Sequence, residues 1–176
     1  MTGTDHIVAR PITAVAFAQY GTVHELLDDK DEKVVWTAGN GWHDGFTAKP
    51  LIDGSGHLGM TRGTAAPWHC GEMERHDRTQ EAIFCADEAI VLAVAPASAA
   101  PAPRREQIEA FVIAPGQAVV MNRGVWHDAC RGLHRPTPYF WMAVCGLGAS
   151  PWVPVEGGSL LIRAGSQEGA GEGNAP

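Results

Sequence analysis

Four residues of this sequence have side chain types and spacings that suit proton transfer or metal binding. Glu74 and His76 are two residues apart, so in a strand both side chains point to the same face. Glu81 follows His76 by five residues and has the opposite parity, so a turn through residues 77–79 must restore its convergence. With His127 from further along the chain, these carboxylates and imidazoles form a candidate general acid/base cluster.

His127 ends a motif that contains two glycines. The motif reads Gly116, five residues, Asn122, one residue, Gly124, two residues, His127. It resembles the second motif of the cupin superfamily, in which a strand, a glycine turn and an inward-facing histidine supply a metal ligand. Asn122 stands where cupins usually have proline, and Arg131 stands where they often have asparagine. The glycines permit the tight turns that reverse the chain between barrel strands.

The first cupin motif is usually His-x-His, three or four residues, then Glu. This sequence fits that spacing if Glu74 replaces the first histidine, with His76 as the second and Glu81 as the acid. The resemblance implies that His76, Glu81 and His127 bind a divalent metal ion, with Glu74 as a fourth ligand or a proton shuttle. Two imidazoles with one or two carboxylates suit Zn²⁺, Mn²⁺, Fe²⁺ or Ni²⁺, and spacing does not choose among them. Without a metal, Glu74, His76 and His127 remain the catalytic candidates.

The elements that must position these residues are short. Thr13 as N-cap and Gly21 as C-cap predict one helix over residues 12–20, with Val15, Phe17 and Ala18 as its apolar stripe. Beyond it, the pattern predicts strands at Lys33–Thr37, His57–Arg62, Met73–Asp77, Glu81–Cys85, Ile90–Ala95, Ala110–Ile113, Ala118–Met121 and Tyr139–Cys145.

Gly, Pro or Asp breaks between these segments favour an all-β barrel or sandwich. Together with the two motifs, they predict an all-β, single-domain cupin, a jelly-roll barrel with a short N-terminal helix. The domain is expected over residues 1–163, with an irregular loop at Pro96–Pro103 and a flexible tail over residues 164–176.

The composition excludes several classes of protein. The 176-residue chain has 13 basic and 20 acidic residues, and its formal net charge of −7 argues against nucleic acid or membrane partners. No apolar stretch reaches the ~18 residues of a transmembrane helix, and residues 1–11 lack a signal-peptide pattern. Four cysteines without a Cys-x-x-Cys pair are typical of free thiols, so we expect a cytoplasmic protein.

Residues 10 to 162 as a whole resemble the ureidoglycolate lyase family, a cupin branch of purine-ring nitrogen salvage. The stretches that carry the resemblance are Phe17–Val23, Glu72–His76, Gln80–Phe84, Ala110–Ile113, Gly116–Val119 and Asn122–His127. Three features depart from the family pattern. The family often has histidine at the position of Gly71 and glutamine at that of Glu81, and residues 46–59 have no clear counterpart.

The resemblance implies cleavage of ureidoglycolate to glyoxylate and urea. Elimination needs a base for the hydroxyl proton and an acid for the departing nitrogen, and Glu74 is the candidate shuttle. The substrate carboxylate favours a guanidinium, because the planar fork pairs with it bidentately. Arg62, Arg75 and Arg123 are the substrate-binding candidates. Strand parity directs Arg75 away from the face of His76, so Arg62 and Arg123 are the better candidates inside the barrel.

Two other functions fit the same residues. One is another metal-dependent cupin enzyme (a dioxygenase, isomerase or lyase) on a small hydroxy- or keto-acid, and the other is a non-catalytic small-molecule-binding cupin. In each case the partner is a small anionic molecule, and the resemblance suggests a homodimer. The sequence leaves open the roles of His57, His69 and Cys70.

Overall fold

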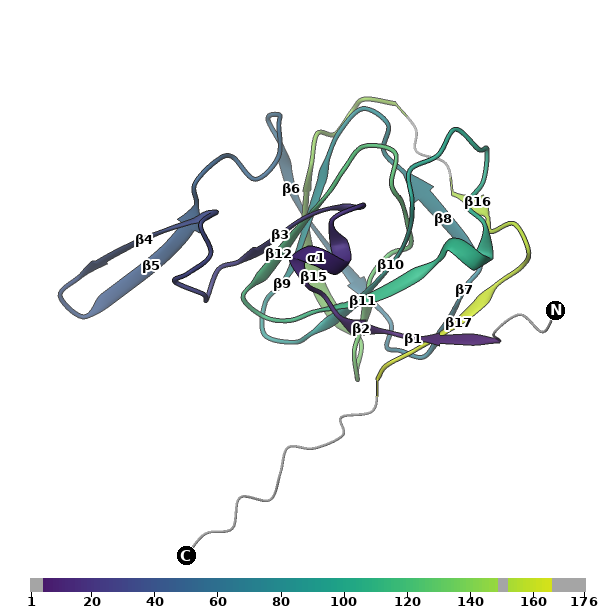
Figure 1. The fold of residues 1–176 in the computed structure, drawn as a ribbon, viewed down its shortest axis with the longest axis horizontal. Helices are drawn as coiled ribbons and strands as arrows, with labels where there is room; N and C mark the ends of the chain where they lie inside the picture. The colour runs from purple at the N-terminus through teal and green to yellow at the C-terminus, as the bar shows by residue number, and fades with distance from the viewer. Residues whose placement is uncertain (1–4, 149–151, 166–176) are drawn as a thin grey trace, which may run out of the picture.

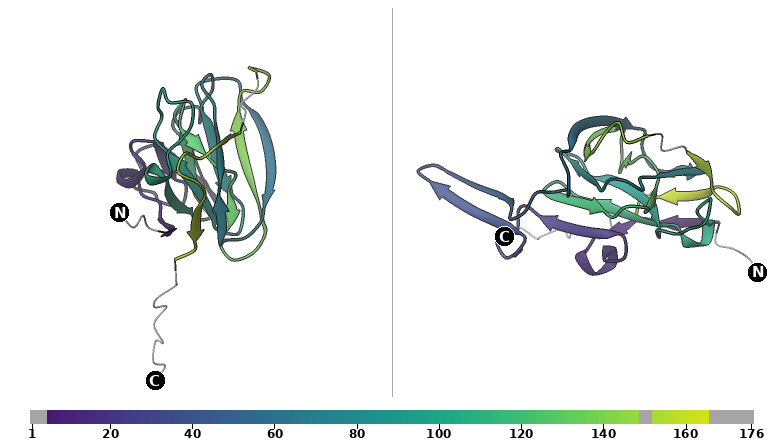
Figure 2. Two further views of the ribbon diagram at one scale, coloured as in Figure 1. Left: turned by 90° about the vertical axis from the view of Figure 1, so that its right-hand side faces the viewer. Right: turned by 90° about the horizontal axis from the view of Figure 1, so that it is seen from above.

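Short antiparallel strands dominate the computed structural model, which describes residues 5–148 and 152–165 (Figures 1 and 2). A seven-stranded sheet contains β2 (Arg10–Pro11), β8 (Glu72–Arg75), β10 (Ile90–Ala95), β11 (Glu109–Ile113), β13 (Trp126–His127), β14 (Arg131–Gly132) and β16 (Val153–Pro154). A five-stranded sheet runs in the order β3 (Gly21–Glu25), β12 (Gln117–Met121), β9 (Glu81–Cys85), β15 (Thr137–Ala143) and β6 (His57–Gly63).

Smaller elements complete the described fold. A three-stranded sheet joins β1 (His6–Val8), β17 (Leu160–Arg163) and β7 (Trp68–Cys70). A separate hairpin pairs β4 (Val34–Gly39) with β5 (Trp42–Thr47), and it projects away from the stacked sheets (Figure 1). The helical segments are α1 (Ala14–Phe17) and a 3₁₀ turn, η1 (Arg105–Gln107).

Two apolar cores hold the sheets together, one on each side of the seven-stranded sheet. The first lies against the five-stranded sheet and includes Leu92, Phe111 and Val119. The second lies against the three-stranded sheet and includes Ala93 and Ile162. Every residue of β10 is buried, which explains why Ile90–Ala95 is a continuous apolar run rather than an alternating one. The all-β jelly-roll barrel with a short N-terminal helix is therefore confirmed.

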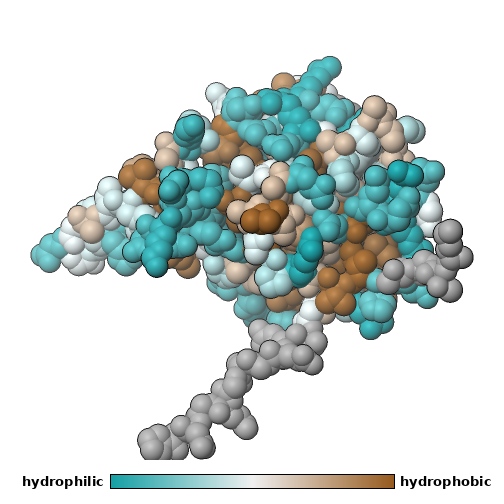
Figure 3. All heavy atoms as spheres, in the orientation of Figure 1, coloured by the Kyte–Doolittle hydropathy of each residue, from teal (hydrophilic) through white to brown (hydrophobic). Residues whose placement is uncertain are grey.

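The helix is shorter than the sequence predicts. Thr13 caps it as expected, since its hydroxyl accepts a hydrogen bond from Ala16 N at 3.1 Å. The helix nevertheless ends at Phe17, because the chain must enter β3 at Gly21, where a Cβ would lie 1.8 Å from Val120 O. The predicted apolar stripe is wrong for Val15, which is 89% exposed. On this face of the molecule, apolar spots are scattered among hydrophilic side chains (Figure 3).

Each of the eight predicted strands overlaps an observed one, and Pro96–Pro103 is irregular as expected. The structure adds strands that the pattern did not predict, including β3 and β5, which alternate poorly in sequence. Residues 166–176, most of the predicted tail, lie outside the described residues, so the tail and the 1–163 boundary stay predictions.

The two motif glycines occupy turns that need them. Gly116 has φ of 87° and Gly124 has φ of 78°, in the left-handed region that side chains rarely adopt. Gly124 N also donates a hydrogen bond of 2.9 Å to His76 O. This bond ties the second motif to the first, so the turn helps to bring their side chains together.

Candidate active site

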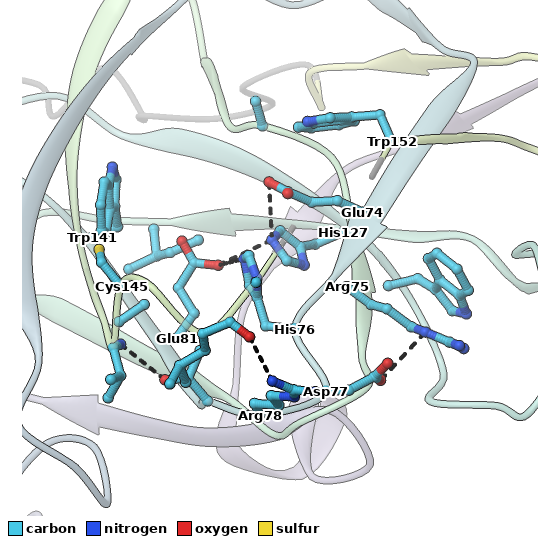
Figure 4. Close-up of a pocket in the computed structure, with 18 of the residues that line it drawn as sticks. Glu74, Arg75, His76, Asp77, Arg78, Glu81, His127, Trp141, Cys145 and Trp152 are labelled. Carbon is cyan, nitrogen blue, oxygen red and sulfur yellow. Dashed lines mark hydrogen bonds and ion pairs between the residues drawn. The ribbon is translucent and has the colours of Figure 1, made fainter. Parts of the chain in front are cut away.

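Four side chains of the two motifs meet in one cavity and point toward one another (Figure 4). Glu74 on β8 and His127 on β13 are cross-strand partners, with Glu74 Oε1 3.9 Å from His127 Nε2. Glu81 Oε2, at the start of β9, lies 3.0 Å from His127 Nε2 and 3.2 Å from His76 Nε2. The loop between β8 and β9 thus restores the convergence that strand parity alone denies to Glu81. We call these four residues the charged end of the cavity.

Burial and mutual contact shift the pKa values at the charged end. Burial by itself raises the pKa of Glu81, but the neighbouring His127 and His76 lower it to about 2. Burial lowers the pKa of His127, yet Glu81 and Glu74 outweigh it and raise that pKa above its ordinary value. For Glu74, burial prevails over the imidazoles and raises its pKa. Glu81 is therefore held as an anion, whereas Glu74 is the carboxyl group that takes up a proton more readily.

The charged end has the chemistry of a metal site. Glu81 Oε2 is buried without a well-formed hydrogen bond, although two imidazole nitrogens face it. His127 Nδ1 lies 3.3 Å from Val125 O, a carbonyl that only accepts, so Nδ1 carries a proton in this contact and Nε2 is the nitrogen that shares a proton with Glu81 or binds a metal ion. Among the described residues, donor atoms of Glu74, His76 and His127 lie within 4.8 Å of one another. This mixed set of nitrogen and oxygen donors fits a first-row divalent ion.

The cavity has a volume of about 850 Å³ and is uneven in charge. Its charged lining residues are four carboxylates and two guanidiniums: Glu74, Asp77, Glu81, Asp128, Arg75 and Arg78. Away from these, neutral side chains from the five-stranded sheet line it, namely Thr61, Ile83, Tyr139 and Trp141, which we call the neutral end. The carboxylates outnumber the guanidiniums, so a protonated imidazole or a bound cation favours the entry of an anionic molecule.

The arginines are not arranged as the sequence predicts. Arg62 is exposed and does not line the cavity, and Arg123 forms an ion pair of 2.7 Å with Asp53 outside the lining. Their expected place inside the barrel is wrong, because Arg62 alternates outward on β6 and Arg123 lies in the turn before Gly124.

Arg75 follows the parity argument. Its guanidinium lies over the Trp126 ring at 4.4 Å and donates to Ser98 O at 2.6 Å, on the side of β8 away from His76. Sequence reasoning missed Arg78, which lines the cavity and donates to Leu147 O at 2.8 Å. Arg78 could have been predicted from its position in the loop that joins two predicted site residues, His76 and Glu81.

Asp128 is a second residue that the sequence did not indicate. It is buried beside His127 and accepts a hydrogen bond of 2.8 Å from Trp68 Nε1, and its other oxygen lies 3.6 Å from Arg131 Nη2. Trp68 is therefore a buried partner of this carboxylate. Burial raises the pKa of the Cys70 thiol, as is typical of a structural rather than a reactive cysteine.

The two undecided histidines lie apart from the charged end. His57 Nδ1 accepts a hydrogen bond of 3.2 Å from Cys145 N, and His69 is exposed on β7. Trp126, next to His127 on β13, is buried. In the described part of the chain, no helix has the length and apolarity to cross a bilayer.

Comparison with known families gives a match over most of the chain. Residues 4–147 match the family described as "Ureidoglycolate lyase". A protein described as "Ureidoglycolate lyase" from Mesorhizobium japonicum is 29% identical over 136 residues, which cover 76% of this chain and 82% of that protein.

Two solved structures show weaker likeness. A dTDP-4-dehydrorhamnose 3,5-epimerase from Elizabethkingia anophelis NUHP1 has a TM-score of 0.37 at 7% identity, covering 68% of this chain and 74% of that chain. RmlC from Streptococcus suis in complex with dTDP-D-xylose has a TM-score of 0.32 at 15% identity, covering 53% of this chain and 45% of that chain. These scores are too low to support an argument, and the fold assignment rests on the strand pairing.

Proposed function

The chain belongs to the ureidoglycolate lyase family, and we propose that it cleaves ureidoglycolate to glyoxylate and urea in the salvage of purine nitrogen through allantoin. The observation that carries this proposal is the charged end. There, two imidazoles and two carboxylates face one point of a cavity whose other end is neutral. The substrate has the same polarity, with a carboxylate and hydroxyl at one end and an uncharged ureido group at the other.

The reaction needs one proton to move between two atoms of the substrate. The reacting carbon bears a hydroxyl, a ureido nitrogen and a carboxylate. The hydroxyl proton leaves, its electrons form the new C=O bond of glyoxylate, and the C–N bond breaks with its electrons on nitrogen, which takes a proton to give urea. Glu74, with its raised pKa, accepts the proton from the hydroxyl and returns it to the nitrogen.

We assign a divalent metal ion to His76, Glu81 and His127, with Glu74 near enough to be a fourth ligand. When bound, such an ion lowers the pKa of a coordinated hydroxyl and supplies the positive charge that a carboxylate substrate requires. The excess of carboxylates in the cavity lining supports this assignment, because it otherwise repels an anion. Zn²⁺, Mn²⁺, Fe²⁺ and Ni²⁺ all suit this donor set, and elemental analysis distinguishes them.

Arg78 is the guanidinium that we propose for the substrate carboxylate. It lines the cavity in the loop that links His76 to Glu81, whereas Arg62 and Arg123 do not line it. Arg75 also borders the cavity, but its guanidinium is engaged by Trp126, Ser98 O and Asp77. A planar guanidinium pairs bidentately with a carboxylate.

The setting of the enzyme is part of the proposal. We propose a homodimer, on the family resemblance, that acts on a small anionic substrate without nucleic acid or membrane partners. A reducing, cytoplasmic compartment is supported by the four cysteines, Cys70, Cys85, Cys130 and Cys145, which are all free thiols.

The direct test of the function is glyoxylate release. Purified protein is mixed with racemic ureidoglycolate, and glyoxylate and urea are followed with each candidate metal present. We expect equimolar glyoxylate and urea, formed well above the non-enzymatic rate and from one enantiomer, so that half of the racemate is consumed quickly. Glyoxylate formation at the non-enzymatic rate under every metal condition contradicts the proposal.

A further inference from the structure

Trp141 forms much of the neutral end, and its indole is held in one orientation. Trp141 on β15 and Gly59 on β6 are cross-strand partners. A Cβ on Gly59 would lie 2.1 Å from Trp141 Cζ2 and 2.2 Å from Cε2, so the ring covers the space where a side chain would stand. One face of the indole therefore lies against the backbone at Gly59. Because Trp141 also lines the cavity, the opposite face is available to a bound molecule (Figure 4).

Hydrogen bonds fix the ring in its plane. Trp141 Nε1 donates to Thr61 Oγ1 at 3.2 Å, and the Thr61 hydroxyl also hydrogen bonds with Tyr139, its own cross-strand partner. Burial raises the pKa of Tyr139, so its phenol stays neutral. Thr61 thus acts as a positioning residue that orients both aromatic side chains, and the surface they present to the cavity carries no charge.

The distance from Trp141 to the charged end suits one small molecule. Trp141 pairs with Ile83 on β9, and Glu81 is two residues earlier on the same face of that strand. Two residues of strand span about 7 Å. From its carboxyl carbon to its terminal nitrogen, ureidoglycolate spans about 5 Å by standard bond lengths. A substrate whose carboxylate and hydroxyl lie at the charged end therefore places its ureido group beside the indole.

We infer that the cavity-facing surface of the Trp141 indole is the platform on which the planar ureido group lies, and that Trp141 sets the preference for ureido acids. This inference rests on the proposed function for the identity of the ligand. A ureido group is flat and uncharged, so it stacks on an aromatic face as an amide or a base does. An acid that lacks the group gains nothing from the indole.

Equilibrium binding tests the inference without depending on turnover. Two probes are titrated calorimetrically into the metal-loaded protein: ureidoacetate, which is the substrate without its hydroxyl, and glycolate, which is the substrate without its ureido group. For Trp141→Leu we expect the Kd of ureidoacetate to rise about 5- to 10-fold, in line with the value of an aromatic contact, with the Kd of glycolate unchanged. Trp141→Phe, which keeps an aromatic face, is expected to retain most of the ureidoacetate affinity.

The chain offers a matched control outside the cavity. Gly39 and Trp42 are cross-strand partners in the β4–β5 hairpin, and a Cβ on Gly39 would lie 2.6 Å from the Trp42 ring. Gly59→Ala displaces the Trp141 indole and is expected to weaken ureidoacetate binding without affecting glycolate. Gly39→Ala and Trp42→Leu make the same changes in the hairpin and are expected to leave both Kd values as in the wild type.

The outcomes separate the inference from the proposed function. If Trp141→Leu raises the Kd of both probes equally, or of neither, the Trp141 indole is not the platform for the ureido group. If circular dichroism shows that Trp141→Leu does not fold, the Kd values of Trp141→Phe and Gly59→Ala decide the same question. A wild type that releases no glyoxylate yet binds ureidoacetate through Trp141 keeps the platform and rejects the lyase. A wild type that binds neither probe rejects the platform directly.

Discussion

The charged and neutral ends of the cavity are built in different ways. At the charged end, Glu74, His76 and His127 come from two neighbouring strands and a loop, and their positions depend on glycine turns and a backbone hydrogen bond. At the neutral end, Trp141 and Thr61 come from the middle of two long paired strands. The first arrangement gathers reactive groups at one point, and the second offers a rigid flat surface. We therefore expect mutations at the charged end to change the rate of the reaction and mutations at the neutral end to change the preference among bound acids.

The largest expected effect comes from His127 at the charged end. His127→Ala removes the imidazole nitrogen 3.0 Å from Glu81 Oε2 and leaves that carboxylate buried without its closest partner. We expect the metal content to fall to background and glyoxylate release to drop by roughly 10³-fold or more. Elemental analysis and a rate assay measure the two effects. His134→Ala, at an exposed site, is the control, and stoichiometric metal in His127→Ala contradicts the ligand assignment.

The next effect distinguishes two roles for Glu74. If Glu74 is the proton shuttle, Glu74→Gln lowers kcat by roughly 10²- to 10⁴-fold while the metal content stays as in the wild type. The glutamine amide keeps the shape of the side chain but does not take up and release a proton as a carboxyl group does. Loss of metal together with activity makes Glu74 a ligand instead, and full activity rules out both roles.

A smaller effect is expected from Arg78, which lines the cavity in the loop between His76 and Glu81. Arg78→Ala removes a guanidinium that lines the cavity, so we expect KM for ureidoglycolate to rise about tenfold, with a smaller change in kcat. Steady-state kinetics measure the split between these constants. Arg163→Ala, an exposed site on β17, is the matched control. An unchanged KM in Arg78→Ala means that another group binds the carboxylate.

The smallest effect concerns a carboxylate outside the cavity whose pKa resembles that of Glu81. Burial by itself raises the pKa of Asp31, but hydrogen bonds from Glu25 N and from Lys33 lower it to about 2 from an ordinary value of 3.8. A lowered pKa in the folded state gives stability that is present above pH ~4 and is lost as pH falls through about 2. Asp31→Asn should therefore lower Tm at pH 7.

This difference in Tm between the wild type and Asp31→Asn is expected to shrink as the pH falls from about 4 to about 2, because the wild type loses the same interaction. Thermal melts across this range measure it, and glyoxylate release at pH 7 serves as the second readout. A Tm difference that stays constant with pH contradicts the assignment. A loss of glyoxylate release in folded Asp31→Asn would contradict the assumption that Asp31, outside the cavity, affects stability alone.

Sequence reasoning found the residues of the charged end because local rules govern them. The two-residue spacing of Glu74 and His76 gives a shared strand face, and the glycines before His127 indicate the turn that aims it. The apolar runs that surround them form strands at the predicted places, since β-branched residues between Gly and Pro breaks leave few alternatives.

The remaining features depend on long-range pairing, which a single sequence does not reveal. Trp141 resembles an ordinary core residue until its partner across the sheet is known to be Gly59. Asp128 has no distinguishing pattern in sequence until Trp68, sixty positions away, is found to donate to it. Which arginine lines the cavity depends on how the loop between β8 and β9 packs, so the sequence placed Arg62 and Arg123 inside the barrel and overlooked Arg78.

Metal content measured together with glyoxylate release tests the role of the charged end most directly. One sample of wild-type protein is analysed for bound metal and assayed with ureidoglycolate as purified, after treatment with a chelator, and after the metal is restored. We expect about one ion per chain, loss of glyoxylate release with the ion, and recovery of release when the ion returns. Undiminished glyoxylate release by protein that contains no metal would contradict a metal-bearing charged end.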